Sequence, residues 1–156
     1  MDECEGAEGK QESVSVVFSR QCEYALQAVL YLALRPKGEL VSMNELTRRL
    51  GTPHHFVAKI LQNLTNKRLL VSQKGPSGGF ALSKAADKIS LLEIVKAIDG
   101  DEFNTRCVLG FPECGGKNPC AVHDQWAGLR EGIFKMMTHK SIAELAREMK
   151  KPGYRT

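Results

Sequence analysis

The 156-residue sequence predicts a mainly α-helical protein that carries one small β-hairpin. Apolar residues recur at spacings of three and four over most of the chain after residue 18, as they do in amphipathic helices. Ser-x-x-Glu capping boxes, which start helices, occur at 42–45, 90–93 and 141–144. A single pair of short strand-like runs flanks the turn "GPSGG" at 75–79.

The first residues differ in composition from the rest of the chain. Residues 1–17 hold five acids, one base and few large apolar side chains, which is typical of a disordered acidic tail. They lack the basic start and apolar stretch of a secretion signal, and no run has transmembrane length. We therefore expect a cytoplasmic protein with no membrane association. Because thiols stay reduced there, the five cysteines favour metal binding or redox chemistry over structural disulfides.

Residues 18–88 have the pattern of a winged helix-turn-helix DNA-binding domain. A first helix starts near Ser19 and ends before Pro36. Two short helices follow, joined by a tight turn in which Thr52 is expected to cap the second one. The hairpin directly after them is most simply the wing. Eight bases against two acids between residues 42 and 88 give a charge that attracts polyanions, although a solvated basic face would look the same.

The second helix of such a motif points its N-terminal residues at the base edges of the major groove. Lys59 can donate to guanine, and the Phe56 ring can pack on a thymine methyl group or a sugar. At the wing, Lys74, Ser77 and bare glycine backbone can approach a phosphate. The alternative is that the two adjacent histidines are surface residues with no specific role. The candidate recognition residues are Pro53, His54, His55, Phe56 and Lys59.

The second half of the chain predicts a connecting helix within 89–106 and a long helix followed by a short one within 122–150. The long helix carries a stripe of Trp126, Leu129, Ile133 and Met136. So long a stripe, so late in a small chain, can bury itself against the same stripe of a second copy, which predicts a homodimer. Packing back on its own domain is the alternative.

Residues 107–123, "CVLGFPECGGKNPCAVH", place three cysteines and one histidine in a loop rich in glycine and proline. The spacing is Cys107-x6-Cys114-x5-Cys120-x2-His123. Structural zinc sites favour pairs of cysteines two to four residues apart, and none is present here. Wider gaps and several glycines let the chain wrap a larger group such as an iron–sulphur cluster. On spacing alone this is the best of several interpretations, with zinc, thiol chemistry and plain structure still open.

A resemblance to a known family adds to this interpretation. The segments that carry it are "EYALQAVLYLA" at 23–33, "FVAKILQNL" at 56–64, "GPSGGF" at 75–80 and the cysteine loop. In this order they resemble the IscR/NsrR family, also called the Rrf-two family, of winged-helix iron–sulphur transcription regulators. The resemblance covers roughly residues 18–150 and is greatest for the IscR branch.

The resemblance implies a homodimer that crosses its long helices, binds a pseudo-palindromic operator in double-stranded DNA and has no enzymatic activity. It also implies a 2Fe–2S cluster on Cys107, Cys114, Cys120 and His123, with 4Fe–4S as the alternative and zinc less favoured. In the nitric-oxide-sensing branch an acid early in the first helix supplies the fourth ligand, and Glu23 occupies the matching place. The competing functions are a zinc- or thiol-dependent regulator of the same fold and an iron–sulphur electron carrier.

Overall fold

The computed structural model describes residues 17–150, so the acidic tail expected at 1–17 lies outside the described residues except for Val17. It contains the predicted combination of helices and one antiparallel hairpin. The elements are α1 (Arg20–Ala33), α2 (Met43–Leu50), α3 (His54–Asn66), β1 (Leu70–Gln73), β2 (Gly79–Leu82), the 3-10 turn η1 (Ala86–Lys88), α4 (Leu91–Asp99), the 3-10 turn η2 (Glu102–Asn104), α5 (His123–His139) and α6 (Ile142–Met149).

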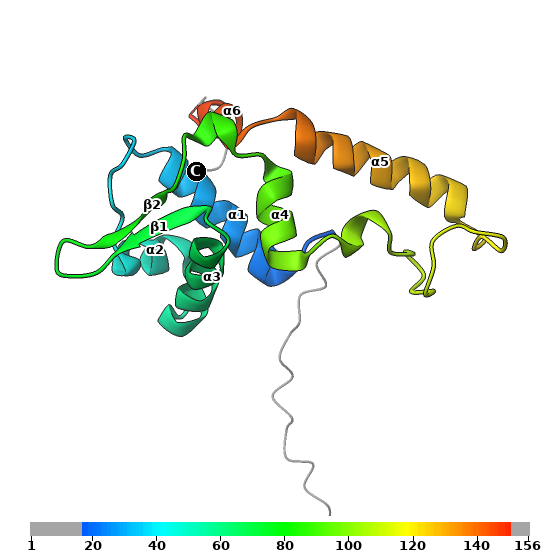
Figure 1. Cartoon of the computed structure of the whole chain (residues 1–156), viewed down its shortest axis with the longest axis horizontal. Coiled ribbons are helices and arrows are strands. Elements are labelled where there is room, and N and C mark those ends of the chain that lie inside the picture. The colour runs from blue at the N-terminus through cyan, green and yellow to red at the C-terminus, as the bar shows by residue number, and fades with distance from the viewer. Residues whose placement is uncertain (1–16, 151–156) are drawn as a thin grey trace, which may run out of the picture.

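Helix α1 is the centre of the fold, because α2, α3, α4, α6 and strand β2 all contact it (Figure 1). Its buried face is made largely of small residues, which lets the neighbouring helices approach closely. The main core joins this face to the apolar stripes of α2 and α3 and to the inner side of the hairpin. Its fully buried large side chains include Leu46, Leu61, Leu64, Leu70, Ile89 and Ile94.

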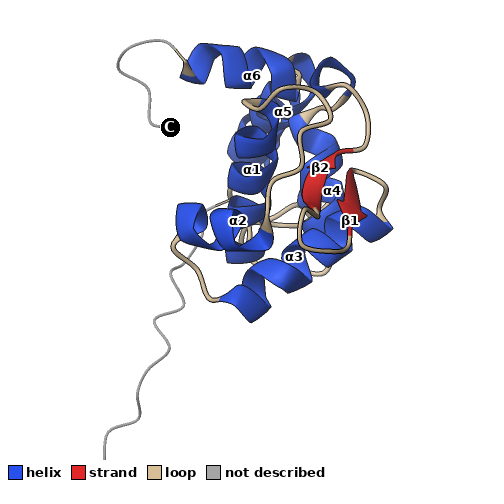
Figure 2. Cartoon of the chain, turned by 90° about the vertical axis from the view of Figure 1, so that its left-hand side faces the viewer, coloured by secondary structure: helices blue, strands red, loops and turns tan. Residues whose placement is uncertain are grey.

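The hairpin lies at the edge of the molecule beside α3 (Figure 2). Leu70 pairs with Leu82 at its base, and Gln73 pairs with Gly79 beside the turn. Val41 adds a backbone bridge to Phe80, with both N–H···O distances at 2.9 Å. A Cβ atom on Gly79 would lie 2.4 Å from the Val41 carbonyl oxygen, so only glycine allows this bridge.

Two of the predicted helix starts differ in detail from the structure. Ser42 accepts from the Glu45 backbone N–H at 3.2 Å as expected, but the Glu45 carboxylate accepts from the Tyr31 hydroxyl instead of reaching back. The prediction of a complete capping box there is therefore wrong. Thr52 does not cap α3 either: Pro53 takes the N-cap position, and the Thr52 hydroxyl donates to the Leu50 carbonyl. The boxes at Ser90 and Ser141 are complete.

The link from α3 to the wing contains a non-glycine residue in the left-handed conformation, Arg68 with φ of 60°. The Arg68 N–H donates to Thr65, and the Leu69 N–H donates to Leu64, which together form a Schellman motif. Ser83 at the end of the wing donates its hydroxyl to the Arg68 carbonyl at 2.5 Å. This turn fixes the hairpin relative to α3.

The stripe predicted for the long helix is divided between two faces of α5. Ile133 packs against a second small core of Cys22, Val95 and Met137, which joins α1, α4 and α5. Leu129 and Met136 instead point outward and are 65% and 52% exposed. Figure 1 shows α5 extending from the body of the fold, with the cysteine loop at its far end.

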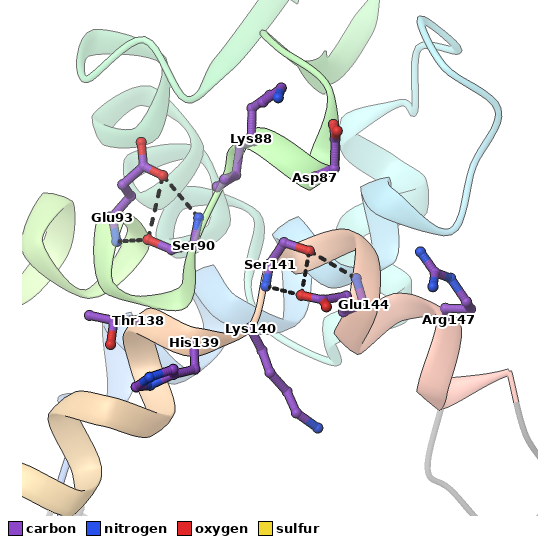
Figure 3. A pocket seen from close by; sticks show the side chains of 11 residues that line it. Asp87, Lys88, Ser90, Glu93, Thr138, His139, Lys140, Ser141, Glu144 and Arg147 are labelled. Carbon is purple, nitrogen blue, oxygen red and sulfur yellow. Dashed lines mark hydrogen bonds between the residues drawn. The ribbon is translucent and has the colours of Figure 1, made fainter.

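A pocket lies where η1, α4, the end of α5 and α6 meet (Figure 3). The two complete capping boxes form part of its wall: Glu93 accepts from the Ser90 N–H at 2.9 Å, and Glu144 from the Ser141 N–H at 2.7 Å. A backbone hydrogen bond from Ile142 to Ile89, 2.8 Å long, joins the two helix starts. The two capping boxes satisfy their own backbone groups, and the hydrogen bond between them docks α6 on the start of α4.

Candidate nucleic-acid interface and cysteine loop

The start of α3 presents several of the predicted recognition residues to solvent. Pro53, His54, His55 and Lys59 are all exposed, whereas Val57 and Ile60 face the core. Helical geometry places His55 and Lys59 four residues apart on one outward face. A face with donors and without competing acidic groups in the first turn can enter a major groove.

Phe56 is the exception among these candidates. Its ring packs edge-on against Tyr24 of α1, with centroids 5.7 Å apart and an interplanar angle of 84°. The side chain is half-buried and packs against the main core. This contact helps to orient α3, and a DNA contact by the partly exposed Phe56 ring stays a prediction. Aromatic pairs of this geometry stabilise by about 1 kcal/mol beyond the area they bury.

The tip of the wing is exposed at Lys74 and Ser77, as the sequence predicted. The glycines beside them have different surroundings. A Cβ on Gly78 would lie 2.1 Å from the Gln73 carbonyl oxygen, so this glycine is required by the turn itself. Gly75, with φ of 110°, is exposed and has open space where a Cβ would lie.

A cationic cluster that the sequence motifs did not indicate surrounds the Tyr31 ring and is formed by Arg35, just after α1, and Arg49 of α2. The guanidinium groups of Arg35 and Arg49 lie 4.9 and 5.4 Å from the centroid of the Tyr31 ring. Arg35 also pairs with Glu45, whereas Arg48 beside them is exposed. The spacing of four residues between Tyr31 and Arg35 could have indicated that these two side chains meet. Only the fold brings Arg49 of α2 to the same ring.

In the cysteine loop, the four candidate ligands lie in two pairs. Cys107 Sγ and Cys120 Sγ are 3.7 Å apart, and Cys114 Sγ lies 3.5 Å from Nδ1 of His123. Gly115, with φ of +103°, passes so close to the imidazole that an added Cβ would lie 3.3 Å from its Cε1 atom. Within residues 17–150, no three such side chains converge as a ready metal site.

The environment acts differently on the two sulfurs of the first pair. Burial raises the pKa of Cys107, but hydrogen bonds from the backbone around Leu109 and Phe111 and from Cys120 outweigh it, so the pKa falls below its ordinary value. At Cys120 the Val122 N–H lowers the pKa, while burial and the neighbouring sulfurs raise it above its ordinary value. A thiolate at Cys107 is the form that binds soft metal ions.

The loop is tied to the start of α5 at both ends. His123 is the first residue of α5, and its N–H donates to the Cys120 carbonyl at 3.0 Å. The Trp126 indole donates to the Arg106 carbonyl, also at 3.0 Å, directly before the first cysteine. Glu23 instead lies in the first turn of α1, paired with Arg20 at 3.2 Å, while the loop projects away from the body (Figure 1).

The donor set fits an iron–sulphur cluster in its chemistry, because three thiols and an imidazole are ligands that such clusters use. In geometry, the Cys107–Cys120 pair and the Cys114–His123 pair would have to move closer together to surround the cluster. Gly110, Gly115 and Gly116 all have φ between 78° and 103°, and no regular secondary structure is present between the first and last cysteine. These features allow the middle of the loop to change shape.

A family model described as "Iron-dependent Transcriptional regulator", Rrf2, matches residues 18–148. The chain belongs to the Rrf2 family. An HTH-type regulator of Aquifex aeolicus is 35% identical over 136 residues, covering 83% of this chain and 93% of that protein. IscR of Yersinia pseudotuberculosis is 31% identical over 122 residues, covering 78% of this chain and 74% of its own. Membership confirms the resemblance that the sequence motifs indicated.

Solved structures of Rrf2 regulators share the fold. CymR of B. subtilis, the global cysteine regulator, superposes with a TM-score of 0.71 at 19% identity, over 84% of this chain and 96% of CymR. IscR of T. potens gives 0.68 at 17% identity, over 88% of this chain and 91% of that structure. The chain is thus a winged-helix transcription regulator of the Rrf2 family, and DNA binding follows from that membership.

Within residues 17–150, none of the helices has the length and apolar character needed to span a bilayer.

Proposed function

We propose that this Rrf2 regulator is a homodimer whose promoter binding responds to an iron–sulphur cluster held by Cys107, Cys114, Cys120 and His123. One observation carries the proposal: all four donors lie in pairs within a single loop, and the last of them is the first residue of α5. We assign residues 18–88 to the DNA-binding domain, 89–106 to the connection, 107–123 to the cluster loop and 122–150 to the dimerisation and C-terminal helices.

The DNA-contacting surface would combine α3 with the wing. His55 and Lys59 on the outward face of α3 would reach base edges, with Pro53 and His54 at its start. Lys74 and Ser77 at the wing tip would contact phosphates on the neighbouring backbone. Phe56 would act from below by packing on Tyr24 and fixing the angle of the helix.

The cluster we propose is 2Fe–2S, with 4Fe–4S as the alternative, because three thiolates and one weaker ligand serve both. When bound, it supplies redox-active iron whose loss or oxidation can be read by the protein. His123 is the fourth ligand we favour, since its imidazole already faces Cys114 in the loop. Glu23 is the alternative. Because the loop projects from the body away from α1, Glu23 would serve from the second subunit (Figure 1).

The dimer contact we propose is the outward face of α5. Val122, Leu129 and Met136 are spaced by seven and are 37%, 65% and 52% exposed, so they form one apolar seam along the helix. A Cβ added to Gly128 or Gly132 of the same helix would meet nothing within 4 Å. A second copy of α5 can approach such a face closely and bury the seam symmetrically.

The path from the loop to the DNA surface runs through α5 and α4. Cys22 of α1, Val95 of α4 and Met137 of α5 are buried together, so a shift of α5 is transmitted to the central helix. Ser19 at the start of α1 donates its backbone N–H to the Asp99 carboxylate at 2.8 Å and thereby ties α1 to the end of α4. DNA affinity can change only by as much as the ligand favours one dimer arrangement over another.

Selection of duplex DNA from a random-sequence library tests the regulator directly, using protein prepared without oxygen and the same protein stripped of iron. The expected result is an enriched pseudo-palindromic motif whose affinity differs between the two preparations. Enrichment of no motif would contradict the DNA-binding assignment. A motif bound equally by both preparations would contradict cluster control and favour a zinc-dependent or constitutive regulator of the same fold.

A further inference from the structure

Two of the three loop cysteines are close enough to form a bond with each other. The Cys107 and Cys120 sulfurs are 3.7 Å apart, and a disulfide would bring them to about 2 Å. Cys114 is engaged elsewhere, 3.5 Å from the His123 imidazole. The loop therefore contains one dithiol and one separate thiol–imidazole pair.

The backbone around the dithiol allows the sulfurs to meet. Cys120 is partly exposed, lies in a segment without regular secondary structure and follows Pro119 in the loop. The chain between the two cysteines contains three glycines with positive φ, at 110, 115 and 116. Because Cys107 is only 2% exposed, a small oxidant is the kind that reaches the pair.

We propose that Cys107 and Cys120 form a redox-sensitive pair that a peroxide converts to a disulfide in the cluster-free chain. The disulfide removes two of the four donors and so prevents loading of the cluster until a thiol reductant reopens it. The block on loading rests on the proposed function, whereas formation of the disulfide does not. Exposure to an oxidant would then change the oxidation state of the chain's own sulfurs, independently of any reaction of the cluster.

The chemistry balances with hydrogen peroxide as the only co-reactant. The thiolate of one cysteine attacks a peroxide oxygen, the O–O bond breaks, and a sulfenic acid forms with release of one water. The second sulfur attacks the sulfenic sulfur and displaces the second water as the S–S bond forms. Two thiols lose two protons and two electrons, and one hydrogen peroxide gains them to become two waters.

The test uses full-length, reduced, iron-free protein treated with one equivalent of hydrogen peroxide, then alkylated, digested and mapped by mass spectrometry. A cross-linked peptide joining Cys107 to Cys120, with the mass of two hydrogens lost, is expected. Cys107→Ser and Cys120→Ser should abolish it, whereas the matched variants Cys114→Ser and Cys22→Ser should retain it. A cross-link from Cys107 to another cysteine, or oxygen addition without a cross-link, would overturn the proposal.

Anaerobic reconstitution with ferrous iron and sulphide separates this inference from the proposed function. The oxidised protein should take up at least about tenfold less iron and sulphide than the reduced protein, and a thiol reductant should restore uptake. Equal uptake by both forms would overturn the block on loading. If the reduced protein takes up no cluster while the mapped disulfide forms, the proposed function fails and the dithiol pair stands.

Discussion

The Nδ1 atom of His123 lies 3.5 Å from the sulfur of Cys114, and His123 is the first residue of α5. One side chain thus belongs both to the loop that carries the candidate ligands and to the helix that carries the exposed seam. Because His123 begins α5, a movement of its imidazole acts directly on the N-terminal end of this helix.

The wing contact is tested by Lys74→Ala. Removing one phosphate contact should weaken binding to all sequences alike and reduce the slope of log affinity against log salt by about one unit. Lys96→Ala removes the same charge from α4 and should leave the slope unchanged. Anisotropy titrations at several salt concentrations give the slopes, and equal slopes for wild type and Lys74→Ala would exclude a wing contact.

The base contact is tested by Lys59→Ala. Loss of a donor to guanine should cost about 1–3 kcal/mol on the preferred operator and relax the preference at one base pair. The measurement is the affinity for single-base variants of the selected operator. If the variant loses the same amount on every sequence, Lys59 contacts the backbone and not a base.

The α5 seam is tested by Leu129→Glu. A charge at the centre of an apolar contact should raise the dimer dissociation constant about 100-fold, or by about 2.7 kcal/mol, while helicity is kept. Thr138→Glu puts the same charge on an exposed position on the other side of α5 and should not dissociate the dimer. Sedimentation velocity measures both, and a dimer that survives Leu129→Glu would place the interface elsewhere.

The buried Cys22 predicts a loss of stability at high pH. Burial, followed by the charge of Asp99, raises its pKa from 9.0 to about 12. The folded state therefore keeps a proton that the unfolded chain releases above about pH 9, so stability is fully present below that pH and falls between 9 and 12. The slope attributable to this thiol is about 1.4 kcal/mol per pH unit, measured by urea unfolding as the difference between wild type and Cys22→Ala. Identical slopes of unfolding free energy against pH for wild type and Cys22→Ala would contradict this prediction.

The left-handed Arg68 predicts a stabilising substitution. Glycine adopts this conformation without steric cost, so Arg68→Gly should raise the free energy of unfolding by about 1 kcal/mol. Arg68→Ala, which removes the same side chain but keeps a Cβ atom, should give no such gain. Urea unfolding of both variants tests whether the conformation or the side chain determines stability at this turn.

Much of the fold followed from local patterns. Periodicity gave the helices, and the glycine-rich turn gave the hairpin, because both depend on neighbouring residues. Long-range competition explains the errors: Glu45 left its capping box because folding brings Tyr31 and Arg35 within reach. The packing of Phe56 on Tyr24 likewise depends on a contact between α3 and α1, which local patterns do not show.

The candidate site was less accessible to sequence reasoning. Spacing singled out the three cysteines and His123 as a group, but it carried no information on how they pair. The pairing depends on the left-handed glycines of the loop and on the start of α5, which bring Cys114 to the imidazole and leave Cys107 beside Cys120. The outward turn of Leu129 and Met136 likewise depends on which face of α5 the second core occupies.

The most direct test of the account is the absorption spectrum of protein purified without oxygen, with iron and acid-labile sulphide assayed, for wild type, His123→Ala and Glu23→Ala. The account predicts a coloured wild type containing both elements, a spectrum altered by His123→Ala and one unchanged by Glu23→Ala. An effect of Glu23→Ala alone would move the fourth ligand to α1. A colourless wild type that contains zinc or no metal would contradict the cluster and leave only the Rrf2 DNA-binding protein.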